Sequence, residues 1–288
     1  TDFDYLVHQE NILISFTYAV TDNSNASDEA TIAIIVTGTN DEATGLDDDL
    51  GDVIEDGPAV EGTVGAPEDL DDNDVYTYLT VPNSLVDENG EVVEGGDITW
   101  DGNTYTFDPL DDFQYLREGE ALPLTFSYEI QELSGDITEP AVVSLEIQGA
   151  NDQPVAENNT LNTTENESAD GTVVYSDADI GDSHTFLITS ITGADEDNID
   201  LDPNTGDYVF NPLTDFDYLV HQENILISFT YTVTDDSSAG NAVSDPAEIT
   251  INIQGANDQP IAQGDVRDAF ENESVDGTVV YSDADIGD

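Results

Sequence analysis

The acidic residues in this sequence that could do chemistry are those that recur at fixed places along the chain. Between residues 151 and 258 they are Glu165, the pairs Asp177/Asp179 and Asp215/Asp217, Asp235, and the dipeptide Asn257-Asp258. Proteins hold Ca²⁺ with about six to eight oxygen ligands, and clustered carboxylates without a cation repel one another strongly. The pattern therefore predicts sites for a hard divalent cation, and we interpret most of the remaining acids as solvated surface.

The overall charge excludes several classes of function. The chain has 66 Asp and Glu against two Arg, and its formal net charge is −64. Such a chain cannot neutralise the phosphates of a nucleic acid or dock on an anionic membrane through a basic patch. The absence of Lys excludes Schiff-base chemistry and P-loop phosphate binding, and the absence of Cys excludes disulfides and Cys-based zinc sites. No apolar run is long enough to span a bilayer, so we predict no direct membrane insertion.

Internal repeats organise the chain. Residues 165–182 recur at 271–288 with Val275 in place of Ala169, and residues 1–20 match 214–233 except at Ala19. A G-x-N-D landmark begins at Gly38, Gly149 and Gly255, which is one landmark per domain length.

This register predicts four segments. Residues 1–41 are the C-terminal part of one repeat, and residues 42–150 are a complete but diverged repeat. Residues 151–256 are a second complete repeat, and residues 257–288 are the opening of another. We expect the two end pieces not to fold properly alone, because each lacks half the strands of its core. The first residue is Thr and Met is absent, so we also expect the chain to be a piece of a longer protein.

The elements that must position the acids are β-strands. Ile225, Ile227, Phe229 and Tyr231 alternate with more polar residues, which is typical of a half-buried strand and argues against a disordered chain. The strands expected within 151–256 lie near 159–164, 171–176, 184–191, 198–202, 207–211, 225–234 and 247–254. Seven strands in about 100 residues indicate an immunoglobulin-like β-sandwich, and the acids above then fall at strand ends and loops.

Five motifs, in order and at domain spacing, resemble those of cadherins. TENESADGTVVYSDADIGD is similar to the cadherin Glu and D-x-D segments, PLTDFDYL to L-D-x-E, YTVTDD to A-x-D, and GANDQP to the linker; LDPNTGDYVF resembles the intervening segment. LREGEALPLTFSYEI and VSLEIQGANDQP equally resemble the VCBS repeats of giant bacterial surface adhesins. The resemblance implies an all-β fold of tandem seven-stranded immunoglobulin/cadherin-like β-sandwiches joined by short Ca²⁺-binding linkers.

The resemblance also implies up to three Ca²⁺ ions per junction. At the first junction the ligands would be Asp2, Asp4, Asn40 and Asp41, facing Asp69, Asp71 and Glu132. At the second they would be Glu55, Asp112, Asn151 and Asp152, facing Asp177, Asp179 and Asp235. At the third they would be Glu165, Asp215, Asp217, Asn257 and Asp258, facing Asp283 and Asp285.

The chain departs from the cadherin pattern in three ways, of which one is that the first linker lacks the Pro and continues into the acidic stretch 47–49. Gly38, Gly149 and Gly255 stand where cadherins have the first linker Asp, which removes one ligand from each junction. Gln114 replaces the second acid of the D-x-E pair, so fewer or weaker ions are expected downstream of residues 42–150.

Other candidate sites have plainer interpretations. Asp69, Asp71 and Asp74 begin like an EF-hand loop, but the later Gly and Glu positions of that motif do not match. The three His lie at no catalytic or zinc spacing, and we interpret them as surface or loop residues. Carboxylates are too abundant for any pair to indicate a glycosidase, and we predict no enzymatic activity.

The expected function is structural. The sequence predicts Ca²⁺-rigidified extender repeats of a secreted bacterial adhesin or cell-surface fibre, located outside the cell. The expected partners are calcium ions and neighbouring repeats, with other copies of the chain and surface polysaccharide as further candidates. Two alternatives stay open: a polysaccharide-binding module, which would need exposed aromatics grouped on one face, and the protomer of a self-assembling Ca²⁺-dependent extracellular filament.

Overall fold

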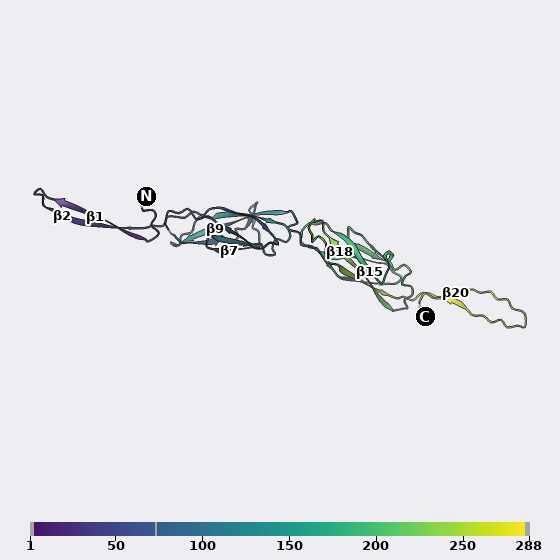
Figure 1. The fold of residues 1–288 in the computed structure, drawn as a ribbon. Coiled ribbons are helices and arrows are strands. Elements are labelled where there is room, and N and C mark those ends of the chain that lie inside the picture. The colour runs from purple at the N-terminus through teal and green to yellow at the C-terminus, as the bar shows by residue number, and fades with distance from the viewer. Residues whose placement is uncertain (1–2, 73, 286–288) are drawn as a thin grey trace. The chain divides into compact units, whose positions relative to one another are not determined.

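Period-two alternation of apolar and polar residues gives this chain strands along most of its length. The computed structural model describes residues 3–72 and 74–285, and apart from the 3₁₀ turn η1 (Glu196–Asn198) their regular structure is β-strand (Figure 1). The chain divides into two compact units, Thr1–Ala150 and Asn151–Asp288, and each is described by itself. Among the described residues no helix is long and apolar enough to cross a membrane.

Two sheets face each other in unit 1. The larger has the order β3-β10-β9-β5, with β6 also paired to β9, and the smaller has the order β4-β8-β7. Their bounds are β3 Asp48–Ile54, β4 Val60–Thr63, β5 Tyr76–Thr80, β6 Val86–Asp87, β7 Asp97–Asp101, β8 Thr104–Asp108, β9 Ala121–Glu132 and β10 Ala141–Gln148. β3 runs parallel to β10, and the other pairs are antiparallel. This is the sandwich architecture that the sequence predicts.

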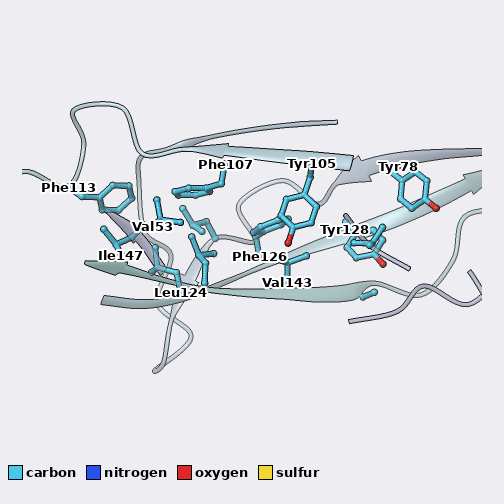
Figure 2. Close-up of a cluster of buried hydrophobic side chains, with 14 of the residues drawn as sticks. Val53, Tyr78, Tyr105, Phe107, Phe113, Leu124, Phe126, Tyr128, Val143 and Ile147 are labelled. Atoms are coloured by element: carbon cyan, nitrogen blue, oxygen red, sulfur yellow. The ribbon is translucent and has the colours of Figure 1, made fainter. Parts of the chain in front are cut away.

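Alternate residues of the central strand β9 fill the core of unit 1. Leu124, Phe126 and Tyr128 point from β9 toward Tyr105 and Phe107 of β8 in the opposite sheet (Figure 2). These side chains are fully or almost fully buried. Burial of large aromatics at period two is what fixes the register of the sheet, because a one-residue slip would turn them all toward solvent.

Unit 2 contains a second sandwich. Its sheets have the orders β12-β19-β18-β15 and β13-β17-β16, and β11 pairs with β14 in a separate two-stranded antiparallel sheet. The bounds are β11 Val155–Glu157, β12 Asn159–Thr164, β13 Ala169–Thr172, β14 Val174–Ser176, β15 Thr185–Thr192, β16 Ile199–Leu201, β17 Asp207–Phe210, β18 Asn224–Thr234 and β19 Ala247–Gln254. The all-β prediction of immunoglobulin/cadherin-like sandwiches is confirmed.

Seven strands are predicted for 151–256, and the structure has nine there, β11 to β19. Every predicted segment contains a strand, but β11 is missed and the predicted strand 171–176 is split at Val173. Val173 is buried, and its N–H donates to the carbonyl of Gly206 at 2.9 Å. At this residue the chain stops pairing with β17 and begins to pair with β11, so one stretch of sequence serves two sheets.

Two hairpins flank the sandwiches within their own units. β1 (Asn11–Thr21) pairs with β2 (Ser27–Thr37) in unit 1, and β20 (Ile261–Gln263) pairs with β21 (Val280–Ser282) in unit 2. Phe16 of β1 is 53% exposed, whereas its counterpart Phe229 of β18 is 1% exposed. On the outward face Leu13 and Leu226 are 67% and 68% exposed. The two matching segments therefore have the same solvent exposure on the outward face and different exposure on the inner face. A second sheet covers the inner face of β18, whereas β1 pairs only with β2 in a two-stranded sheet that no other described sheet covers.

A glycine pair tests this difference. A Cβ on Gly171 would lie 2.5 Å from the ring of Tyr208, whereas at Gly277, in the same local sequence, the nearest atom is Arg267 Nε at 3.9 Å. We expect Gly171→Ala to lower the free energy of unfolding by about 1–3 kcal/mol through overpacking, and Gly277→Ala to leave it nearly unchanged. Chemical denaturation followed by circular dichroism measures both. Equal losses in the two variants would contradict the proposed packing.

Candidate metal centres

One arrangement of the D-x-D loop and the linker occurs three times, each time inside a single unit. The backbone N–H of the second Asp donates to Oδ1 of the first, and the N–H of the linker Asp donates to Oδ2 of the second. The first contact is Asp71 to Asp69 at 3.0 Å, Asp179 to Asp177 at 3.2 Å, and Asp285 to Asp283 at 3.2 Å. The second is Asp41 to Asp71 at 3.0 Å, Asp152 to Asp179 at 2.9 Å, and Asp258 to Asp285 at 3.0 Å. The structure thus brings together linker and D-x-D loop at all three predicted places.

The second Asp of each loop keeps one oxygen without a protein partner. Oδ1 of Asp71, Asp179 and Asp285 is buried and has no hydrogen-bond partner among residues 3–72 and 74–285. A buried carboxylate oxygen left unpaired is costly, so such atoms call for a ligand. Carboxylate and amide oxygens are the donors that Ca²⁺ prefers, and these residues therefore fit a hard divalent cation.

In unit 1 the acids gather around the end of β9. Asp69, Asp74 and Glu132 offer oxygens that all lie within 4.8 Å of one another. Glu132 is buried and accepts from Asn40 Nδ2 and from the N–H of Ala43, both at 2.8 Å. The linker is therefore fixed on the strand end that carries the acid. Of the other predicted ligands here, Asp4 is partly buried, and Asp2 lies outside the described residues.

The opening of unit 2 has the same arrangement with different partners. Asp177, Asp182 and Asp235 offer oxygens within 4.8 Å of one another, and Asn151 Nδ2 donates to Asp235 Oδ2 at 3.2 Å. His184 Nε2 lies 2.7 Å from Asp177 Oδ2, and the two side chains are 9% and 4% exposed. His184 lies in the loop before β15, as its interpretation as a surface or loop residue allows, but its side chain is not at the surface, because folding brings it to the first Asp of this loop.

The third set lies at the other end of unit 2. Glu165, Asp258 and Asp285 offer oxygens within 4.8 Å of one another. Glu165 is fully buried at the end of β12; its Oε1 accepts from the N–H of Ala256 at 2.7 Å, and its Oε2 has no partner among the described residues. Burial, followed by the charges of Asp258 and Asp285, raises the pKa of Glu165.

The first Asp of the motif that resembles D-x-E accepts a hydrogen bond from a neighbouring loop in both complete repeats. Asp112 Oδ2 accepts from the N–H of Gly96 at 2.9 Å, and Asp215 Oδ2 accepts from Asn198 Nδ2 at 2.9 Å. Asp217 lies close enough to raise the pKa of Glu165 and of Asp258 by charge repulsion, after the larger effect of burial. The roles of Asp112, Asp215 and Asp217 as metal ligands stay predictions.

Glu55 is among the ligands predicted for the second junction, which we call the middle set. It is buried at the end of β3 and accepts from the N–H of Ala150 at 2.6 Å.

Two acids of these groups are absent from the predicted ligand sets, although a signal in the sequence could have found them. Asp74 and Asp182 join the acid groups, and each follows its D-x-D loop at the same spacing, D-x-D-x-x-D. The spacing recurs in both repeats, but the third Asp is not part of the motifs on which the resemblance to cadherins rests. Repetition within the chain was here the better guide than resemblance.

Close packing explains why each linker has a glycine at its first position. A Cβ on Gly38, Gly149 or Gly255 would lie 2.3 Å from a backbone carbonyl oxygen of the preceding loop, that of Val7, Arg117 or Val220. Their N–H groups donate to the carbonyls of Glu10, Glu120 and Glu223 at 2.7–2.9 Å. The linker therefore needs close approach of two backbones at this position, and a ligating side chain has no room there.

The pH dependence of stability tests the burial of these acids. Burial raises the pKa of Asp179 to about 6 and also raises the pKa of Asp71. Between about pH 4 and pH 6 the folded chain then binds more protons than the unfolded chain, so the free energy of unfolding falls as pH rises through this window. We expect demetallated protein to melt at a higher temperature at pH 5 than at pH 7.5. The trend should weaken in Asp179→Asn, and a flat profile would contradict the raised pKa values.

One domain-family model matches part of the chain. Residues 151–252 match the family model described as "Bacterial Ig domain". That model does not describe a catalytic family, and immunoglobulin-like sandwich domains are typically structural or adhesive modules. A search of curated proteins found no match to the sequence.

Solved structures of cadherins are similar to the chain at low identity. Human mucin-like protocadherin EC1-2 is 14% identical, with 75% of this chain and 98% of that chain covered and a TM-score of 0.42. Mouse cadherin-23 EC22-24 is 16% identical, with coverages of 89% and 77% and a TM-score of 0.44. Mouse protocadherin-24 EC1-3 is 15% identical, with coverages of 88% and 81% and a TM-score of 0.46. TM-scores below 0.5 add nothing about function.

Proposed function

We propose that this chain is a stretch of calcium-dependent structural repeats from a secreted bacterial adhesin or cell-surface fibre. The observation that carries the proposal is the threefold recurrence of one buried oxygen, Oδ1 of Asp71, Asp179 and Asp285, beside a linker that is already docked. The match to a bacterial immunoglobulin-like domain supports the adhesive or structural role and the extracellular location.

The residues that would hold the ion are clearest at the third set. Glu165 Oε2 and Asp285 Oδ1 are buried oxygens that have no partner within the described chain, and Asp258 brings a third carboxylate. A bound Ca²⁺ supplies the positive charge that offsets their mutual repulsion. Because Asp258 belongs to the linker and Asp285 to the next repeat, the ion would hold the linker on that repeat. In unit 1, Asp69, Asp71, Asp74, Asn40 and Glu132 would do the same.

The mechanism is thermodynamic linkage. An ion that binds the docked linker but not the separated one stabilises the docked state by RT ln(1 + [L]/Kd) for each site. A string of repeats is thereby stiffened by the calcium of its surroundings. The middle set, with Glu55 and Asp112 in unit 1 and Asp177, Asp179 and Asp235 in unit 2, stays a prediction.

Calcium titration with a matched pair of variants tests the proposal. Glu165→Gln removes a buried charge from the third set, whereas Glu167→Gln makes the same change at an exposed position two residues away. In isothermal titration with Ca²⁺ we expect Glu165→Gln to lose at least one site or to weaken it more than tenfold, and Glu167→Gln to behave as the parent. Hydrogen exchange should show calcium-dependent protection of the Asp258 N–H. No heat above that of dilution in the parent chain would sink the proposed function.

A further inference from the structure

Each complete repeat has a side chain that donates a hydrogen bond to the first Asp of its D-x-D loop. In unit 1 the hydroxyl of Tyr76 donates to Asp69 Oδ2 at 2.8 Å. In unit 2 Nε2 of His184 lies 2.7 Å from Asp177 Oδ2. An ionised carboxylate can only accept hydrogen bonds, so His184 is the donor in that contact. Two different residue types therefore make the same contact.

The two donors occupy the same position in the repeat. Tyr76 lies seven residues after Asp69, and His184 lies seven residues after Asp177. We call Tyr76 and His184 the seventh-position donors. The position and the accepting atom agree while the residue type differs. This indicates that the two repeats share the hydrogen bond and not one particular side chain.

Strand pairing explains why this position reaches the loop. Tyr76 is the first residue of β5 and pairs with Glu132 at the end of β9. His184 immediately precedes β15, which pairs with β18 up to the residue before Asp235. In each unit the donor therefore comes from the strand beside the one that carries the acid of the cation set, Glu132 or Asp235. The sheet that places the acid also places the donor.

The donor completes the fixing of the first Asp. Oδ1 of Asp69 accepts from the N–H of Asp71 at 3.0 Å, and Oδ1 of Asp177 accepts from that of Asp179 at 3.2 Å. With the seventh-position donor on Oδ2, both oxygens are held, one by the loop backbone and one by the neighbouring strand. A carboxylate oxygen has two lone pairs, so each of these oxygens can still bind a cation.

Both cation sets also contain a buried oxygen that lacks a partner. In unit 1 it is Oδ2 of Asp74, a residue whose carboxylate belongs to the same set as that of Asp69. In unit 2 it is Oδ1 of Asn151, whose Nδ2 donates to Asp235. Neither oxygen has a hydrogen-bond partner among residues 3–72 and 74–285. An ion bound here would give each of them a partner, as buried polar atoms require.

The first Asp needs such a donor because its neighbours repel it. Asp69, Asp74 and Glu132 offer oxygens within 4.8 Å of one another, and like charges at this distance push the side chains apart. A neutral hydroxyl reduces this repulsion. Burial, followed by the hydrogen bond to Asp69 and the charge of Asp69, raises the pKa of Tyr76, so its hydroxyl keeps its proton and stays a donor.

Packing fixes the donors themselves. Tyr76 packs against the hydrophobic core of unit 1. The side chain of His184 is 9% exposed, and its ring centroid lies 4.8 Å from that of Tyr175. A donor whose rotamer is held by packing can hold a metal ligand in one orientation before the ion arrives.

We propose that the seventh-position donors are positioning residues of the cation sites. Tyr76 holds Asp69, and His184 holds Asp177, in the orientation that binds Ca²⁺. Hydrogen bonds of this kind orient metal ligands, and their loss typically lowers metal affinity about 10- to 100-fold. The inference rests on the proposed function, because it takes these acids as Ca²⁺ ligands. It adds that tyrosine and histidine can replace one another at this position, since each supplies one donor to Oδ2.

Calcium titration of the full chain, followed by ¹⁵N–¹H NMR in Ca²⁺-buffered solutions, tests each donor separately. The N–H groups of Asp71 and Asp179 donate to the first Asp of their loops, so their signals report the two sites one by one. We expect Tyr76→Phe to weaken binding about 10- to 100-fold at the Asp71 signal and to leave the Asp179 signal unchanged. Substitution of its exposed neighbour, Thr77→Ala, should change neither signal.

Two amide substitutions at His184 give a sharper test. Glutamine carries its amide nitrogen about as far from the backbone as Nε2 of histidine, whereas asparagine carries it near the place of Nδ1. We expect His184→Asn to weaken binding at the Asp179 signal about 10- to 100-fold. His184→Gln and His184→Tyr should rescue it, because both present a donor at the reach of Nε2. A role in packing alone predicts similar losses in all three variants.

The outcomes separate this inference from the proposed function. A parent chain that responds to Ca²⁺, with unchanged midpoints in Tyr76→Phe and His184→Asn, overturns the positioning role and leaves the proposed function standing. Equal losses in His184→Gln and His184→Asn overturn the positioning role as well, and these two variants decide the question if Tyr76→Phe does not fold. A parent chain in which no signal responds to Ca²⁺ overturns both proposals.

Discussion

Saturating this chain with Ca²⁺ is expected to raise its melting temperature by an amount on the order of 15–30 °C. A site filled at about 1,000 times its Kd contributes about 4 kcal/mol, and a domain of this size gains about 4–8 °C per kcal/mol. The physical reason is that the fold brings carboxylate oxygens of Glu165, Asp258 and Asp285 within 4.8 Å of one another, and two of these residues are buried. Differential scanning calorimetry of demetallated protein, with Ca²⁺ added stepwise, measures the shift.

The control for this prediction is general screening of charge. A chain with a net charge of −64 is stabilised by any salt that shields its self-repulsion. NaCl at matched ionic strength should therefore give a small shift, and Mg²⁺ an intermediate one, because it demands tight octahedral geometry and gives up water reluctantly. A shift in NaCl as large as that in CaCl₂ would mean that the buried oxygens bind no ion.

Phe16 and Phe229 occupy the same position in matching sequences, but we expect only Phe229 to contribute strongly to stability. Phe229→Ala is expected to lower the free energy of unfolding of unit 2 by about 3–5 kcal/mol, because a fully buried ring leaves a cavity. That ring also packs edge-on against Tyr208, with the centroids 5.2 Å apart and the planes at 74°. Phe16→Ala removes the same side chain from a matching sequence, but the side chain is half exposed, so we expect a loss within about 0.5 kcal/mol.

Two probes separate the units in this experiment. The single tryptophan, Trp100, lies in unit 1 and packs in its core against Tyr78 and Tyr128, so its fluorescence follows unit 1. Circular dichroism follows both units. Phe229→Ala should shift the dichroism transition in demetallated protein, and Phe16→Ala should shift neither signal. Comparable losses from the two substitutions would show that the β1–β2 hairpin packs on something in solution.

Recurrence was the most informative property of the sequence. The alternation in 225–234 predicted β18 to within one residue, because half-buried strands need period two and this segment has it throughout. Short strands were harder. β11 has three residues, too few for a pattern, and the change of partner at Val173 depends on the carbonyl of Gly206, which is far along the chain.

Some residues of the candidate site could be predicted from the sequence and others could not. The positions of the D-x-D loops and linker acids follow from repetition, and the structure brings each linker Asp to its loop. Asn198 and His184 carried no signal of their own, since one amide or imidazole in a polar loop matches many patterns. Their roles arise because β-strands bring the loop containing Asn198 beside Asp215 and His184 beside Asp177.

By itself the sequence determined the longer strands, the spacing of the repeats and the identity of the recurring acids, because these depend on residue type and spacing along one chain. The tertiary structure alone decided which carboxylate oxygens are buried without a partner, and which copy of a repeated segment is covered by a second sheet. Burial and close approach depend on residues distant in sequence. For that reason Phe16 and Phe229, or Glu165 and Glu271, have matching local sequences and opposite surroundings.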